Sequence, residues 1–142
     1  MAVLLSVILV LTCTLVHYEV LRWANRYSVT PTLVPRQGRV VVILFTSMAS
    51  HLVHILLFGL VFFYLREKLD LGGFGGNYGD NLRSFIYFSA ETYTSVGYGD
   101  IYPKGALRLV SSIETLLGLM LISWSASLSY LEMQRHWSSA QE

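Results

Sequence analysis

Three stretches of this sequence are long and apolar enough to cross a lipid bilayer, and they limit the possible fold more than any other feature. We place them at residues 2–20, 40–64 and 106–130. A helix that spans the hydrocarbon core needs about 20 residues, because each residue rises about 1.5 Å. Of the 142 residues, 54% are hydrophobic and 13% are charged. The sequence therefore predicts an all-α membrane protein with three transmembrane helices.

The first span is predicted to be a retained helix. It begins MAVLLSVILV, with no Lys or Arg ahead of the apolar run. A removed secretory signal has a positively charged start and a small-residue cleavage site. The net charge of +1 provides no basic field for nucleic acid, and the single cysteine, Cys13, is expected to be a packing residue.

Two polar stretches separate the spans. Residues 17–39 contain four arginines and two prolines, which predicts a broken helix and a connecting loop. Residues 66–81 are rich in Gly, Asn and Asp, which is typical of a surface loop. Asp80 is expected to be the N-cap of the segment that follows.

That following segment, NLRSFIYFSAETYT, is too short to span the bilayer and too apolar for a water-exposed helix. We expect a re-entrant half-helix. Non-helical backbone at membrane depth is tolerated only inside protein or along a watery cavity, so the glycine-bearing stretch after this helix should line a pore. Its two glycines permit positive φ, so that successive carbonyls can point the same way.

The run ETYTSVGYGD at residues 91–100, followed by Ile-Tyr-Pro, resembles the pore signature of potassium channels, usually written TVGYG. The resemblance covers residues 40–130, and residues 1–39 are an additional helix and loop. It implies that K⁺ is the permeant ion and that no other cofactor is bound. The ion-binding positions that it assigns are Ser95, Val96, Gly97, Tyr98 and Gly99, the last at the outer mouth.

The resemblance also implies residues that support this filter. Glu91 and Asp100 match a carboxyl pair behind the filter, and we expect one of them to keep its proton because two close carboxyls do not both ionise readily. Ser95 replaces the usual Thr, which predicts a softer innermost site. The remaining support positions are Thr92, Thr94 and the aromatic pair Tyr87 and Phe88, expected to hold Tyr98.

One filter supplies one line of oxygens, and an ion has to be surrounded. The sequence contains a single filter and no internal repeat, so the resemblance implies a homotetramer, with three identical subunits as the partners of each chain. The C-terminal end of the half-helix would add a partial negative charge near the ion path.

The third span carries small and polar residues along one helical face: Ser111, Glu114, Gly118, Ser125 and Ser129. This face is expected to meet either water or a neighbouring helix. Gly118 resembles the hinge glycine of family inner helices, and close packing would require the same residue.

Glu114 is costly inside a bilayer unless it is paired, protonated or facing a cavity. Counting residues places His54 at a similar depth, which suggests a contact between His54 and Glu114 that senses pH. Satisfied buried histidines are the alternative. A zinc site is disfavoured, because His51 and His54 without further ligands do not close one.

Charge does not orient the chain, because five Arg or Lys residues fall at each end of the spans. The outward filter of the family implies an external N-terminus and a cytoplasmic C-terminus in the cell membrane. No arginine-rich voltage sensor is expected, and only about a dozen residues follow the third span.

The function predicted is a non-enzymatic, potassium-selective channel. A weakly selective cation channel and a non-conducting assembly subunit are the alternatives. A membrane metalloenzyme built on His51, His54 and Glu114 is a further competing class.

Overall fold

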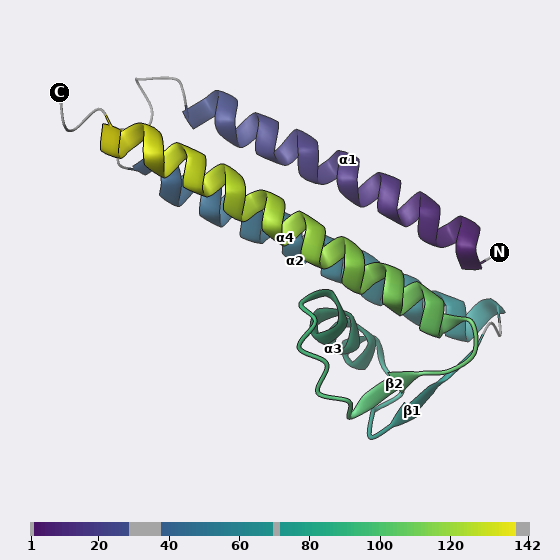
Figure 1. Ribbon diagram of the computed structural model, residues 1–142. Coiled ribbons are helices and arrows are strands. Elements are labelled where there is room, and N and C mark those ends of the chain that lie inside the picture. The colour runs from purple at the N-terminus through teal and green to yellow at the C-terminus, as the bar shows by residue number, and fades with distance from the viewer. Residues whose placement is uncertain (1, 29–37, 70–71, 139–142) are drawn as a thin grey trace.

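The structure, a computed structural model, describes residues 2–28, 38–69 and 72–138. Three long helices, α1 (Ala2–Ser28), α2 (Gly38–Leu69) and α4 (Leu107–Ser138), run side by side (Figure 1). The short helix α3 (Leu82–Tyr93) and the strands β1 (Phe74–Gly76) and β2 (Ile101–Pro103) lie at one end of them. The predicted all-α class with three membrane-spanning helices is confirmed.

The spans are longer than the apolar runs alone predicted. Stretches long and apolar enough to cross a membrane extend over Val3–Arg26, Gly38–Arg66 and Leu107–Arg135. The predicted helix break after residue 20 is wrong, because the helix-breaking prolines come only at positions 31 and 35 and arginines are good helix formers. The rest of that loop, residues 29–37, lies outside the described residues.

The N-cap of α3 is Asn81, not Asp80 as predicted. The Asn81 side chain accepts a hydrogen bond from the Ser84 N–H at 3.1 Å. Asp80 instead forms an ion pair with Arg66 of α2. This pair ties the loop before α3 to the C-terminal end of α2.

The glycine-rich stretch expected to be a surface loop contains a strand. β1 pairs antiparallel with β2, so that Gly76 faces Ile101 in register. Next to this pair, the Asn77 N–H donates to the Asp100 carbonyl at 2.9 Å. A Cβ on Gly76 would lie 1.9 Å from that carbonyl oxygen, and its φ is +106°, so only glycine fits. The segment before α3 and the segment that begins at Asp100 are thereby fastened together.

Aromatic rings fill the space between α2, α3 and β1. Phe74 packs edge-on against Phe85 and Phe88, with ring centroids 5.0 and 4.9 Å apart. Phe62 of α2 packs against Phe88 at 5.1 Å. Edge-to-face pairs at these distances are favourable beyond the area that they bury, so this cluster anchors α3 against the second span.

The N-terminus of α1 lies at the same end of the long helices as α3 and the strands (Figure 1). Since α1, α2 and α4 each cross once, the two described chain ends lie at opposite ends of the bundle. The loop between α3 and β2 and the start of α1 therefore lie at the same end (Figure 1).

Candidate functional site

The loop after α3 alternates in backbone handedness. Ser95, Gly97 and Gly99 have φ of +57°, +55° and +79°, and Ser95 is the one residue other than glycine with positive φ in the described chain. The intervening Val96 and Tyr98 keep negative φ. Such alternation gathers successive N–H groups on one side of the backbone and turns the carbonyls to the other.

Hydrogen bonds hold the N–H side of this loop against α3. The Ser95 N–H donates to the Thr92 carbonyl at 3.0 Å, and the Gly97 N–H donates to the Glu91 carbonyl at 3.2 Å. By contrast, within the described part of the chain no hydrogen bond reaches the carbonyl oxygens of residues 95–99. Five consecutive unpaired carbonyls at the end of a membrane protein helix require water or a cation.

Glu91 braces the loop from behind. Its carboxylate oxygen Oε2 accepts a hydrogen bond from the Tyr98 N–H at 3.0 Å, and the residue is only 5% exposed. Burial raises the pKa of Glu91, the charge of Asp100 raises it further, and the Tyr98 hydrogen bond opposes both effects. Burial, more than the neighbouring acid, is the larger cause of this shift, and the expectation that one acid of the pair keeps its proton stays a prediction.

Asp100 closes the outer end of the loop. Its Oδ1 accepts from the Ile101 N–H at 3.1 Å and from the Tyr87 hydroxyl at 3.4 Å. The rings of Tyr87 and Tyr98 stack in parallel planes with centroids 6.5 Å apart. Tyr87 thus contacts both the tyrosine and the acid of the loop, as a support residue should.

The first half of the loop continues from the C-terminus of α3. The Thr94 N–H donates to the Ala90 carbonyl at 3.2 Å, and the Thr94 hydroxyl donates to the same oxygen at 2.7 Å. The unpaired carbonyl end of a helix carries about half an elementary negative charge. Thr92, as acceptor for Ser95, and Thr94, as the cap, both shape the turn into the loop.

Comparison with protein families bears directly on this arrangement. The family model described as "Ion channel" matches residues 50–131, more than half of the chain, from within α2 through the loop and most of α4. The chain belongs to this ion channel family. It is accordingly a multi-pass membrane protein. Comparison with curated proteins and with solved structures gives no match.

One expected support residue of this ion channel lies elsewhere. Phe88 is 3% exposed and packs into the aromatic cluster with Phe62 and Phe74. It makes no ring contact with Tyr98 among the described residues, so the predicted aromatic pair is reduced to Tyr87. The reason is helical geometry, because adjacent residues on α3 point about 100° apart.

The predicted contact between His54 and Glu114 is not formed. Glu114, which is fully buried, accepts a hydrogen bond from the Ser89 hydroxyl of α3 at 2.5 Å. Ser89 is not identified as a site residue in the sequence, since a lone serine on a helix carries no signal. Nδ1 of His54 is instead 3.3 Å from the Tyr93 hydroxyl, and no hydrogen bond joins it to Glu114 in the described chain.

Neither His17 nor Tyr93 is singled out by the sequence, and both lie buried in the interior of the chain beside His51 and His54. Nδ1 of His51 is 2.9 Å from the Tyr93 hydroxyl. His17 of α1 is hydrogen-bonded to Ser50 at 3.1 Å and to Ser125 at 3.0 Å. The sequence shows only that His17 lies near the middle of the first helix, which does not say which face of that helix meets α2.

The small and polar face of α4 meets neighbouring helices of the same chain, which is one of the two expected outcomes. Its members Ser111, Glu114, Gly118, Ser125 and Ser129 are all buried in a single chain. A Cβ on Gly118 would lie 2.1 Å from the Tyr93 carbonyl oxygen. Gly118 therefore permits close approach of α4 to the C-terminus of α3.

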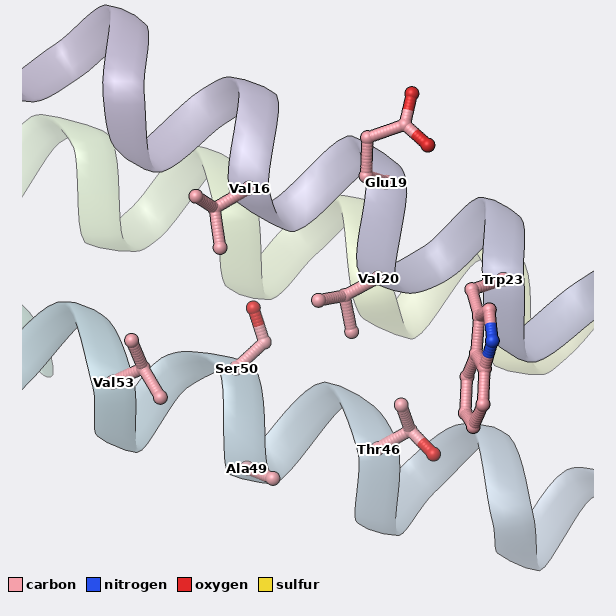
Figure 2. Close-up of a pocket in the computed structure, with 8 residues that line it drawn as sticks. All are labelled: Val16, Glu19, Val20, Trp23, Thr46, Ala49, Ser50 and Val53. Atoms are coloured by element: carbon pink, nitrogen blue, oxygen red, sulfur yellow. The ribbon is translucent and has the colours of Figure 1, made fainter.

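A groove of about 560 Å³ runs between α1 and α2 on the surface of this ion channel chain (Figure 2). Val16, Val20 and Val53 contribute to its apolar lining. Ser50 points between the helices toward α1, whereas the Glu19 carboxylate points away from α2 (Figure 2). The groove thus lacks converging polar groups, and Ser50 serves the histidine network behind it.

Proposed function

We propose that this chain is the subunit of a potassium-selective channel and that the carbonyl oxygens of residues 95–98 bind the ion. The observation that carries the proposal is the alternating handedness at Ser95, Gly97 and Gly99, together with the absence of partners for the carbonyls in the described chain. A strand or a helix would have paired these groups. A row of free carbonyls is what a dehydrated cation requires in place of its water shell.

The mechanism involves no bond chemistry. A K⁺ ion gives up its water on entering, and rings of carbonyl dipoles from several chains replace that hydration. The C-terminal end of α3, capped by Thr94, adds a partial negative charge close to the path. Glu91, which holds the Tyr98 N–H, keeps the amide side of the loop turned away from the ions.

The proposed assembly is a homotetramer around the filter. Val96 and Tyr98 are 54% and 73% exposed in the single chain, and a channel axis and neighbouring subunits would cover both. The filter end is proposed to face outward, with the N-terminus external and the C-terminus cytoplasmic. This orientation rests on the outward-facing filter of the potassium channels that the sequence resembles, because the number of arginines and lysines favours neither side.

A weakly selective cation channel is a second candidate, favoured by two observations. Ser95 adopts positive φ without being glycine, at a cost of about 1–2 kcal/mol, so the innermost ring is strained and lacks the methyl group of threonine. Phe88 packs into the core and leaves Tyr87 as the aromatic support of Tyr98. A less rigid filter would discriminate less between K⁺ and Na⁺.

Ion flux into liposomes that contain the purified protein distinguishes the candidates. We expect K⁺ flux that greatly exceeds Na⁺ flux and is blocked by Ba²⁺, a doubly charged ion similar in size to K⁺ that should lodge near Ser95. Comparable K⁺ and Na⁺ fluxes would indicate the weakly selective channel. Absence of flux from a correctly assembled protein would contradict both and indicate a non-conducting subunit.

A further inference from the structure

Three histidines from two helices converge in the interior of the chain. His17 belongs to α1, and His51 and His54 lie three residues apart on one face of α2. One ring nitrogen from each lies within 4.8 Å of those of the other two. The ring of His17 has its centroid 5.0 Å from that of His51 and 5.5 Å from that of His54.

The hydroxyl groups of Ser125 and Tyr93 contact the rings of this cluster. The Ser125 hydroxyl is 3.0 Å from Nε2 of His17 and 3.1 Å from Nε2 of His51. The Tyr93 hydroxyl links the Nδ1 atoms of His51 and His54. Nε2 of His54 is buried and has no partner with good hydrogen-bond geometry in the described chain, and the Cys13 backbone is the group that lies within electrostatic reach of this ring. A buried ring nitrogen in this condition is costly unless it binds something.

We propose that His17, His51 and His54 form a binding site for a divalent transition metal of the Zn²⁺ type. Imidazole nitrogen suits Zn²⁺, Cu²⁺ and Ni²⁺, and three histidines with one open position are an established zinc ligand set. Bonds of about 2.0–2.1 Å in a tetrahedron place ligand nitrogens about 3.3 Å apart, so the three nitrogens, now within 4.8 Å of one another, would have to move closer on binding. The Tyr93 hydroxyl or a water completes the fourth position.

Compensating charge and access are both available. Glu114 is fully buried, its Oε2 has no hydrogen-bond partner among the described residues, and it lies close enough to Tyr93 to act on that hydroxyl electrostatically. Ionised Glu114 would offset part of the metal charge.

A groove of about 440 Å³ between α2 and α4 is lined by His51 and Ser125, so the half-buried His51 offers a route to the cluster.

The site would connect the additional first helix to the channel module. His17 is the ligand from α1, and Tyr93 is the last residue of α3, directly before the filter loop. Metal binding would therefore hold α1 against the part of the chain that positions the filter. The metal site does not depend on K⁺ selectivity, so the two proposals fail independently.

The test is Zn²⁺ binding by the purified full chain after removal of metal with a chelator, followed by calorimetry and by Co²⁺ absorption spectroscopy. We expect one ion per chain, a tetrahedral Co²⁺ spectrum, and a rise of several degrees in melting temperature with Zn²⁺. His17→Gln and His54→Gln, which retain hydrogen-bonding groups, should each weaken Zn²⁺ binding at least about tenfold.

His136→Ala is the matched control. His136 is the fourth histidine of the chain and lies eleven residues beyond Ser125 on α4, about 16 Å further along the helix. Its substitution should leave Zn²⁺ binding unchanged. The proposal is overturned if the folded wild-type protein binds no stoichiometric Zn²⁺, or if His17→Gln binds as tightly as His136→Ala; the histidines then form only a hydrogen-bonded network.

Discussion

At the scale of single residues, the proposed filter depends on the backbone conformation of residues 95–99. The two glycines of the loop are readable from the sequence as candidates for positive φ, and both have it. The positive φ of Ser95 was not predictable, because serine rarely adopts it. In the structure, hydrogen bonds from the Ser95 N–H to Thr92 and from the Gly97 N–H to Glu91 hold this conformation. The two glycines thus indicated which loop has this backbone conformation, and the hydrogen bonds to α3 determine the conformation of Ser95.

Gly97→Ala is expected to abolish or strongly reduce ion flux. A Cβ at Gly97 would meet nothing within 4 Å in the chain, so crowding is not the cause. The cost is conformational, about 1–2 kcal/mol in each chain for an L-residue at φ +55°. Liposome flux measures it, with Gly73→Ala as control, since Gly73 also has open space but no positive φ. Equal flux from the two variants would contradict the role given to backbone handedness.

Glu91 should make stability depend on pH. Because burial raises its pKa above the ordinary 4.5, the folded state favours the neutral acid. The contribution of neutral Glu91 to the free energy of unfolding is complete below about pH 4.5 and is lost as the pH rises through the raised pKa. Melting temperature as a function of pH should therefore fall less steeply in Glu91→Gln, which keeps an oxygen for the Tyr98 N–H. Identical slopes for the wild type and the variant would show that Glu91 titrates normally.

At the scale of elements, long apolar runs predicted the three spans, and a segment too short to span and too apolar for water predicted α3. Helix ends were less predictable, because arginine-rich sequence continues a helix as well as it ends one. The β1–β2 pair was not predicted, because strands of three residues are too short to show an alternation of apolar and polar side chains. The histidine cluster required knowing which face of α1 meets α2, and the first span is too uniformly apolar to indicate a face.

Gly118→Ala is expected to lower the free energy of unfolding by about 1–3 kcal/mol, because a Cβ would collide with the Tyr93 carbonyl at 2.1 Å. Chemical denaturation of the purified protein measures the change, again beside Gly73→Ala. A hinge without close packing predicts the opposite pattern, with unchanged stability and altered channel opening.

At the scale of the whole molecule, the account requires four chains. Large apolar side chains such as Leu116 and Met120 of α4 are exposed in the single chain, at 61% and 63%. This face of α4 is opposite the buried stripe and is free to line a central cavity or to meet lipid and other subunits. The chain belongs to a family of ion channels and contains one proposed filter, and both facts favour assembly of several chains around one pore.

The purified protein in lipid nanodiscs is expected to have four times the 16.0 kDa mass of the chain. K⁺ should stabilise this assembly more than Na⁺, because an ion bound only between assembled filters adds its binding free energy to assembly. Mass photometry or native mass spectrometry during heating, in K⁺ and in Na⁺, gives both quantities. A stable monomer, or equal stability in the two salts, would count against carbonyl binding of K⁺.

The most direct test of the central claim is an experimental structure of the protein in lipid with Rb⁺ or Tl⁺ replacing K⁺. The account predicts four chains around one axis, with heavy-ion density on that axis between the carbonyl oxygens of residues 95–98. Filter loops that face lipid, or an assembled axis without ions at these oxygens, would contradict it.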